Sequence, residues 1–297
     1  MSSFNSSVGE SAIQYPLTLP AGRLSRTTKL LVGELLLGCL PARGRKVLAE
    51  GDPMQFSRLD RLLLAGHIAR ARKTGEWAPL SQVQQRFWSG QGGMLFNSVR
   101  DVADRFESWF LGKHQAIVEA LAAEIGDGSG WLALNELGSG NGLALDYLSR
   151  RFPALPMLRG IDLNSEAATA NTARYANGRL QFITAEASAW VAGNAGPQCI
   201  WFSNAGVLEY LPEASVACIY QTIAKTGAPA LFALVEPLAA SHDLHTHHHS
   251  LINEGEHSYS HNHAVLLKAA GWSLCYQTEM PLAGLRWQLL VAMTPAP

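Results

Sequence analysis

The residues best suited to chemistry gather in a glycine-rich stretch. An apolar run ends at Glu136, and three glycines follow at alternate positions: Gly138, Gly140 and Gly142. Glycines directly after a strand let the backbone turn tightly and approach a ligand without interference from Cβ. The next segment has helical spacing, so its N-terminal amides can face an anionic group. Asp162, about twenty residues on, is placed to accept hydrogen bonds from ribose hydroxyls.

The glycine spacing separates two kinds of nucleotide-binding loop. The dinucleotide fingerprint G-x-G-x-x-G needs a glycine at the position that Leu143 occupies. The stretch instead reads E-x-G-x-G-x-G, and in this it resembles the first motif of the class I S-adenosylmethionine (SAM) methyltransferases. The resemblance covers residues 101–297 and implies SAM as the cofactor.

The resemblance also implies roles for individual residues. The glycines would bring the backbone close to the methionine part of SAM, and Glu136 would orient this loop or hold the ammonium group. Asp162 would bind both ribose hydroxyls, or else cap the helix beginning near Ser165. Glu186 would face the adenine amino group, with a plain surface loop as the alternative. The residues implied for cofactor binding are Glu136, Gly138, Ser139, Gly140, Gly142, Asp162, Leu163, Glu186, Ala187 and Asn204.

The stretch after the fourth predicted strand, 202–212, bears on the acceptor. It lacks the Asn/Asp-Pro-Pro-Tyr run with which related enzymes methylate exocyclic amines of nucleobases or glutamine. It also lacks the paired glutamates of arginine methyltransferases. Together with a net charge of −1, these absences argue against nucleic acid and favour a small-molecule substrate.

Transfer of the SAM methyl group depends more on alignment of the acceptor than on general acid–base catalysis, because the sulfonium already activates the carbon that is transferred. Alignment can supply roughly 7–11 kcal/mol, and a base helps only when the nucleophile carries a proton. We expect the catalytic residues to be Tyr210, His261 and Asn204, with Glu209 or Glu236 as other candidate bases; Glu236 is more typical of a structural role. The predicted substrate pocket comprises Tyr15, Phe96, Tyr175, Glu209 and Asn262. Core packing of the aromatic rings and helix capping by Asn262 are the competing roles.

Segment 242–263 is rich in histidine, which suggests a metal site. The spacing H-x-H can bind zinc or copper, but no carboxylate or cysteine set completes a tetrahedral site. Metal-dependent methyltransferases of this fold instead use oxygen ligands on magnesium. We therefore predict an exposed polar loop and no metal, in the region where the family builds its substrate pocket.

From residue 131 onward, strands alternate with helices. This pattern predicts an α/β fold with a Rossmann-like, seven-stranded, mostly parallel sheet and helices on both faces. By resemblance, the last two strands form an antiparallel hairpin at one edge. The predicted strands are 132–137, 157–162, 180–184, 198–203, 229–235, 272–278 and 286–293, and the predicted helices are 142–151, 165–176, 212–226 and 261–270.

Residues 1–100 fall outside the resemblance and are predicted to be helical. Helices are expected over 28–40, 56–73 and 79–88, followed by a sharp break at 90–93 and a long helix over 101–125. We predict two domains, an N-terminal helical cap or lid (1–100) and a SAM-binding catalytic domain (101–297). The N-terminal helices could equally form a dimer interface, so the oligomeric state stays open.

Composition bounds the class of protein. With 47% hydrophobic and 16% charged residues among 297, the chain is typical of globular proteins. Its four cysteines lack a C-x-x-C pair and are read as reduced thiols of a cytoplasmic protein. No secretory signal is visible, and the apolar run 30–40 is too short to span a bilayer. Neither a membrane nor a nucleic acid is expected as a partner.

Two reactions fit these observations. The leading prediction is methylation of a small metabolite at nitrogen or oxygen. The alternative is that SAM itself is the substrate: its α-amine attacks its γ-carbon, giving azetidine-2-carboxylate and methylthioadenosine. A non-catalytic SAM-binding protein is disfavoured because the motif is complete, and a nicotinamide dehydrogenase is disfavoured by the glycine spacing.

Overall fold

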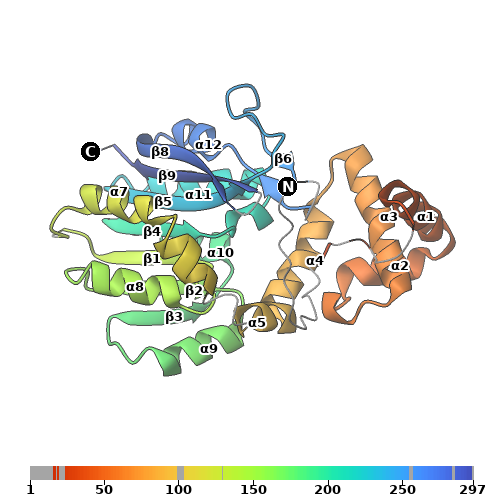
Figure 1. Cartoon of the computed structure of the whole chain (residues 1–297), viewed down its shortest axis with the longest axis horizontal. Helices are drawn as coiled ribbons and strands as arrows, with labels where there is room; N and C mark the ends of the chain where they lie inside the picture. The colour runs from red at the N-terminus through yellow and green to blue at the C-terminus, as the bar shows by residue number, and fades with distance from the viewer. Residues whose placement is uncertain are drawn as a thin grey trace.

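A seven-stranded sheet organises the chain (Figure 1). The computed structural model describes residues 16, 17, 19, 24–98, 104–128, 130–253, 257–282 and 285–295. The strand order is β3-β2-β1-β4-β5-β9-β8; β1 to β5 are parallel, and β9 is antiparallel to β5 and β8. The strands are β1 (Ala133–Leu137), β2 (Leu158–Asp162), β3 (Leu180–Thr184), β4 (Cys199–Asn204), β5 (Ala230–Leu238), β8 (Ser273–Leu282) and β9 (Leu285–Met293). The predicted α/β fold class and edge hairpin are confirmed.

Helices cover both faces of the sheet. They are α7 (Gln115–Ile125), α8 (Leu143–Arg151), α9 (Ser165–Arg174), α10 (Ala187–Asn194), α11 (Glu213–Ala224) and α12 (His263–Ala269). One apolar layer packs Leu121 of α7 and Leu145 of α8 together with Phe202. The other includes Ile219 of α11 and Trp201. Trp201 and Phe202 are consecutive in β4, so the alternation of side chains along a strand supplies both layers.

The N-terminal helices form a bundle beside the sheet, with α4 and α5 between the two (Figure 1). They are α1 (Arg26–Cys39), α2 (Pro41–Ala49), η1 (Pro53–Gln55), α3 (Arg58–Thr74), α4 (Ala78–Ser89) and α5 (Gln91–Ser98). The axes of α1 and α3 approach closely at Gly33 and Gly66, where a Cβ on either residue would lie 2.3 Å from backbone of the other helix. Leu63, Leu64 and Ile68 of α3 are fully buried in the core of this bundle.

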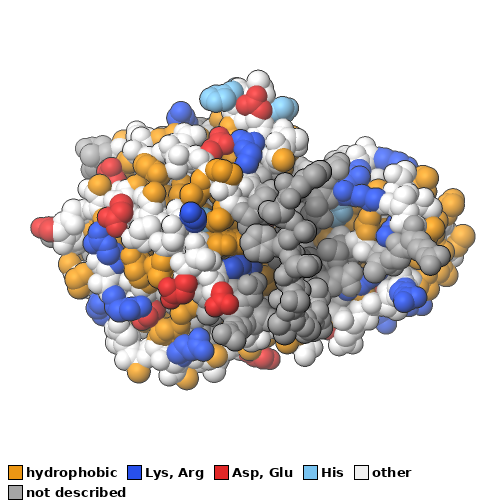
Figure 2. Space-filling view, viewed as in Figure 1, with side chains coloured by type: hydrophobic (Ala, Val, Ile, Leu, Met, Phe, Trp, Pro, Cys, Tyr) orange, Lys and Arg blue, Asp and Glu red, His pale blue; other side chains and the backbone are white. Residues whose placement is uncertain are grey.

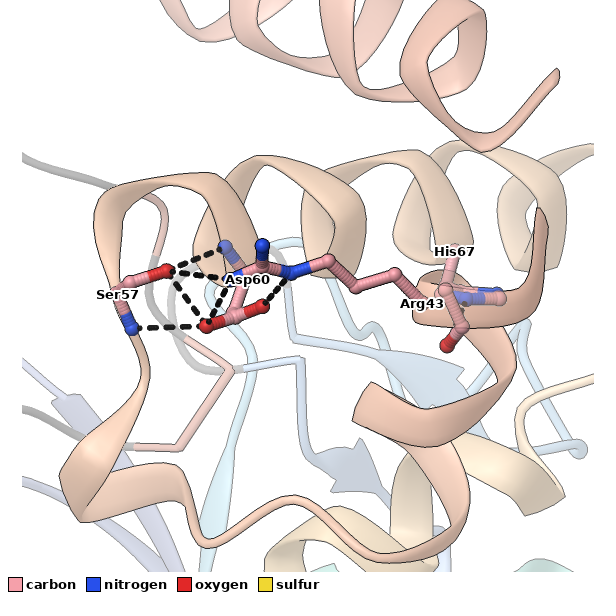
Figure 3. Close-up of polar contacts among 5 residues, drawn as sticks. Arg43, Ser57, Asp60 and His67 are labelled. Atoms are coloured by element: carbon pink, nitrogen blue, oxygen red, sulfur yellow. Dashed lines mark hydrogen bonds and ion pairs between the residues drawn. The ribbon is translucent and has the colours of Figure 1, made fainter. Parts of the chain in front are cut away.

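Polar contacts fix α2 against the start of α3 (Figure 3). Ser57 and Asp60 form a capping box, which satisfies amides at the N-terminus of α3. Arg43 of α2 donates from Nε to Asp60 Oδ1 at 2.8 Å, and His67 Nε2 lies 3.0 Å from the carbonyl oxygen of Gly44. These contacts stabilise the bundle itself, away from the glycine-rich loop.

Two predicted N-terminal features were wrong in detail. The chain bends at Gly90, but Gly92 and Gly93 lie inside α5, where a Cβ would overlap the Phe87 ring or the Trp88 carbonyl. The predicted helix 101–125 is divided: a π-helical turn, η2 (Phe106–Leu111), ends before α7 begins. The amides of Lys113 and His114 both donate to the carbonyl of Trp109 at 2.7 Å, which closes this turn. Residues 101–103 lie outside the described ranges.

Further elements were not predicted individually from the sequence. They include α2, α5, α10 between β3 and β4, and a two-stranded ribbon of β6 (Leu251–Ile252) and β7 (Tyr259–Ser260). In the described part of the chain, no helix combines the length and apolarity needed to cross a membrane.

Candidate functional site

The glycine-rich loop leaves β1 and leads into α8. Gly138, Gly140 and Gly142 have φ angles of 74°, 49° and 76°, a region that strongly favours glycine. The amides of Gly138 and Ser139 donate to the carbonyl of Ile161 at 2.7 and 3.1 Å. A Cβ at Gly138 would lie 2.4 Å from Val207, in the loop after β4. The glycines therefore let the backbone of this loop pack closely between the end of β2 and the loop after β4.

Asp162, the last residue of β2, holds this loop in place. Its Oδ2 accepts from the Gly140 amide at 2.8 Å, and its Oδ1 accepts from the Asn164 amide at 2.9 Å. Burial raises the pKa of Asp162, and these backbone donors oppose that shift. Each carboxylate oxygen keeps a lone pair beyond the bond it makes. Asp162 can therefore shape the loop and still accept a hydroxyl donor from a ligand.

Glu136 lies in β1 and is 2% exposed. Burial raises its pKa well above the ordinary value, and the charge of Asp162 adds to this effect. Its Oε2 has no hydrogen-bond partner among the described residues. A buried, unpartnered carboxylate oxygen beside a cavity is suited to a cationic or hydrogen-bond-donating ligand.

Glu186 caps α10. Its Oε2 accepts from the Ala189 amide at 2.7 Å, and its Oε1 accepts from the Ser188 hydroxyl at 3.1 Å. The helix after β2 is capped by Asn164, whose Oδ1 accepts from the Ala167 amide at 2.9 Å. The alternative role considered for Asp162, helix capping, thus belongs to Asn164. Glu186 combines its capping role with a position at the cavity.

These strand ends open onto a cavity of about 330 Å³. Such a volume is at the small end of the range for ligand pockets. Of the residues implied for cofactor binding, all except Gly142 line it. Gly142 instead begins α8, where a Cβ would meet Tyr175 and Phe182 at under 3 Å. Tyr210, Asn204, Phe96 and Glu209 from the predicted catalytic and pocket sets also line the cavity.

Glu236, in the neighbouring strand β5, holds the loop after β4 in place through hydrogen bonds. Its Oε1 accepts from the Ser203 hydroxyl at 2.6 Å and from the amides of Val207 and Leu208 at 3.2 Å. Burial raises the pKa of Glu236 to about 7. Glu236 is not among the residues that line the cavity, so its contacts agree with a structural role.

Aromatic side chains from α4 and α5 close one side of the cavity. The ring of Trp88 lies 5.1 Å from that of Phe96 and 5.2 Å from that of Tyr210, between centroids. Asn164 donates from Nδ2 to the carbonyl of Gly90 at 2.8 Å, which ties the end of α4 to the loop after β2. Thus α4 and α5 contact the two strand ends that carry Asp162 and Asn204.

Three predicted residues lie away from the cavity. His261 Nε2 lies 3.1 Å from the carbonyl of Leu208, and Asn262 caps α12. Tyr175 packs on Phe182 and donates its hydroxyl to the carbonyl of Asn141 at 3.0 Å. Tyr15 lies outside the described residues.

The histidine-rich segment divides into two kinds of side chain. His245, His247, His248 and His249 are exposed, and Figure 2 shows histidines gathered on the projection at the top of the view. His242, His257, His261 and His263 are instead buried, so the prediction of a wholly exposed loop was wrong for them. The buried rings pack locally: His263 Nδ1 lies 2.8 Å from the Tyr220 hydroxyl, and the His257 ring lies 6.0 Å from that of Trp77. Among the described residues, no group of three or more His, Cys, Asp or Glu could hold a metal ion.

Sequence reasoning missed several lining residues. They are Gln85, Trp88, Asn97, Arg105, Phe106, Trp109, Phe110, His114 and Trp287, together with loop residues beside those predicted. Most belong to 85–114, and the aromatic density of this segment was the one signal available. His114 and Trp287 carry no such signal, because the sequence does not show that the turn before α7 meets β9.

Comparisons with known proteins agree on the fold. No protein-family model matches the chain, and no curated protein matches it. Magnesium protoporphyrin IX methyltransferase (ChlM) from Synechocystis with bound SAM is 15% identical, with a TM-score of 0.50 over 72% of this chain and 97% of that chain. N-methyltransferase NodS from Bradyrhizobium japonicum is 14% identical, with a TM-score of 0.44 over 62% of this chain and 96% of that chain. The likeness to the first shows that the two chains share a Rossmann-like α/β fold.

Proposed function

We propose that the protein binds SAM in this cavity and methylates a small-molecule acceptor at nitrogen or oxygen. One observation carries the proposal: the glycine loop, Asp162 and Glu186 follow three adjacent parallel strands and line the same cavity. Ligands of open α/β sheets bind in the crevice outside the carboxyl ends of the strands.

The residues present fit SAM group by group. Asp162 has remaining lone pairs for the ribose hydroxyls, and Glu186 with Ala187 lies one strand further, toward the position of the adenine. The unpartnered Oε2 of Glu136 suits the ammonium group of the methionine part. Gly138, Ser139, Gly140 and Leu163 would supply close-approaching backbone. Gly142 would act indirectly, by starting α8.

When bound, SAM supplies a methyl group already activated by a sulfonium. The remaining task for the protein is to align the acceptor and exclude water. We assign alignment to Asn204 and Tyr210 at the end of β4, and exclusion of water to the aromatic side chains of α4 and α5. His261 is left out of the catalytic set, because its ring is buried against Leu208 and does not line the cavity.

The N-terminal helices within residues 1–100 would then serve as a lid on the domain formed by residues 101–297. Closure of such elements commits a ligand and completes a site. Four free cysteines accord with a reducing cytoplasmic location. A small acceptor, with no nucleic acid or membrane partner, fits a cavity of about 330 Å³.

Two measurements test this function. Calorimetry should show that S-adenosylhomocysteine (SAH) binds the full chain, whereas NAD does not. Incubation with SAM and a panel of small acceptors should release SAH only when an acceptor is present. The proposal fails if the intact protein gives no heat with SAH, or if it binds the nicotinamide nucleotide instead.

One observation favours the alternative reaction, in which SAM is the substrate. The aromatic side chains of α4 and α5 that close one side of the cavity would also suit a sealed pocket in which SAM reacts with itself. In that reaction the α-amine forms a bond to the γ-carbon, the bond from that carbon to sulfur breaks, and the amine loses a proton. Incubation with SAM alone decides between the two: methylthioadenosine and azetidine-2-carboxylate indicate cyclisation, and their absence supports methyl transfer.

A further inference from the structure

His114 occupies the turn before α7 and lines the cavity. The residue is only 1% exposed, and its ring centroid lies 5.4 Å from that of Trp287 in β9. Neither ring nitrogen has a hydrogen-bond partner in the part of the chain that the structure describes. Leaving a buried polar group unpaired costs about 1–3 kcal/mol, so these nitrogens indicate a place for a ligand group.

Asn204 carries a second unpaired polar atom nearby. Its Oδ1 is buried without a hydrogen-bond partner among the described residues. Burial lowers the pKa of His114 to about 4, and a weak hydrogen-bonding contact with the Asn204 side chain, too loose in geometry to pair either group fully, opposes this shift. The ring is therefore neutral at pH 7, with one donor nitrogen and one acceptor nitrogen. A ligand hydroxyl group can donate to the acceptor nitrogen.

This pair lies in a different half of the cavity from the residues assigned to SAM. The other SAM residues lie at or after the ends of β1, β2 and β3, and Trp287 belongs to β9. Asn204, which the resemblance also implied for cofactor binding, is the last residue of β4, and we assign it to the acceptor because its side chain approaches His114. The rings of Trp109 and Trp287 lie 5.9 Å apart beside His114. Flat apolar walls around neutral polar atoms suit a flat, uncharged ligand.

The charged groups of the cavity are engaged elsewhere. Among the described residues they are Glu136, Asp162, Glu186, Glu209 and Arg105. The first three belong to the SAM half. Glu209 folds back on its own loop, since a Cβ at Gly206 would lie 2.3 Å from its Oε1. Arg105 lies over the rings of Phe96 and Trp109, at 4.7 and 5.9 Å. A cationic acceptor at His114 would lose its hydration without gaining a counter-charge there, and the one described cation of the cavity, Arg105, is already stacked on the rings of Phe96 and Trp109.

We propose that His114 and Asn204 form the acceptor subsite, and that the acceptor is an uncharged aromatic or enolic compound bearing a hydroxyl group. This inference rests on the proposed function. The hydroxyl donates to the acceptor nitrogen of His114. When the oxygen–methyl bond forms and the methyl–sulfur bond breaks, the bonding pair stays on sulfur and the hydroxyl proton moves to His114. The resulting imidazolium returns its proton to water.

Binding of simple ring compounds tests the subsite directly. Calorimetry on the full chain saturated with SAH should show phenol binding at least tenfold more tightly than benzylammonium or benzoate, which carry the same ring. Failure of SAH itself to bind would count against the proposed function. With SAH bound, equal or tighter binding of either charged compound, or no binding of phenol, overturns the subsite.

Replacement of His114 separates the subsite from a structural or cofactor role. His114→Phe keeps a ring of similar size, so we expect an unchanged or raised melting temperature and SAH affinity within twofold of the original. Phenol affinity should fall at least tenfold, whereas His248→Phe on the exposed loop should change nothing. A tenfold loss of SAH affinity in His114→Phe would instead assign His114 to the cofactor.

Methyl transfer supplies a second measurement. With SAM and a panel of phenols and primary amines, we expect methylation of phenols, slowed roughly 10²–10⁴-fold by His114→Phe. Methylation of amines alone overturns the proposal. If neither class reacts, the phenol-binding comparison decides.

Discussion

The two halves of the cavity are built in different ways. In the half after β1, β2 and β3, most polar groups bond to the protein itself: Asp162 accepts from Gly140 and Asn164, and Glu186 caps α10, while Glu136 Oε2 is the exception among the described residues. In the half formed by β4, β9 and the turn before α7, His114 and Asn204 Oδ1 have no hydrogen-bond partner among the described residues. Under the proposed function, the first half binds SAM, which is the same in every turnover, and its loop is held in place by the protein's own hydrogen bonds. The second half would bind the acceptor, and its unpaired polar atoms between aromatic rings would determine which acceptor fits.

The largest expected effect is that of Asp162→Ala. This change removes the acceptor for two amides and, under the proposed function, for the ribose hydroxyls. Hydrogen bonds to charged groups contribute about 1.5–3 kcal/mol each, so SAH affinity should fall at least roughly 100-fold, or about 2.7 kcal/mol. Calorimetry measures this. Asp146→Ala on α8 is the control, because Asp146 pairs only with Arg150 at the surface. If Asp162→Ala and the control bind SAH with equal affinity, the half of the cavity after β1, β2 and β3 is not the SAM site, and the contrast between the two halves fails.

A smaller effect is the pH dependence of the free energy of unfolding that arises from His261, whose ring packs against the loop after β4. The pKa of His261 is lowered to about 4 by burial, against 6.5 when unfolded. Because the unfolded chain binds more protons at this histidine, its burial does not reduce the free energy of unfolding above about pH 6.5. As the pH falls from 6.5 toward 4, the free energy of unfolding decreases. One such histidine accounts for roughly 2 kcal/mol between pH 7.5 and 5.

Denaturant unfolding across this range checks the prediction. His261→Asn should reduce the dependence of unfolding free energy on pH by that amount. His248→Asn, on the exposed part of the segment, should leave the dependence unchanged. Identical pH profiles for His261→Asn and the original chain would show that burial of this ring does not affect the protonation equilibrium.

The smallest effect concerns the contact that joins α4 to the sheet. Asn164→Asp keeps the cap of α9 but loses the donor to the Gly90 carbonyl at 2.8 Å and to the Trp88 carbonyl at 3.3 Å, of which the first is the stronger bond. One hydrogen bond contributes about 1 kcal/mol, so SAH affinity should fall about fivefold, with faster hydrogen exchange in α4 and α5. Asn164→Ala also loses the cap and should lower the melting temperature further. If Asn164→Asp matches the original chain in SAH affinity and in hydrogen exchange of α4 and α5, the lid contact contributes nothing and only the cap matters.

The sequence predicted the sheet and the glycine loop because both depend on local patterns. Alternating strands and helices gave the seven strands to within a few residues, and three glycines marked a turn that their positive φ angles require. The division of helix 101–125 was not predictable. It depends on a π-helical turn whose carbonyl at Trp109 accepts from two amides, and the apolar spacing continues through it.

The segment from Glu136 to Glu186 thus specified one half of the cavity by itself, since adjacent strands in the chain are adjacent in the sheet and bring their ends together. Only the tertiary structure decided the other half. It brings Trp88, His114 and Trp287, which come from segments far apart in the chain and were not predicted, beside Asn204, which was. Their meeting depends on how helices and the antiparallel hairpin pack on the sheet, and long-range packing leaves no periodic signal in a single sequence.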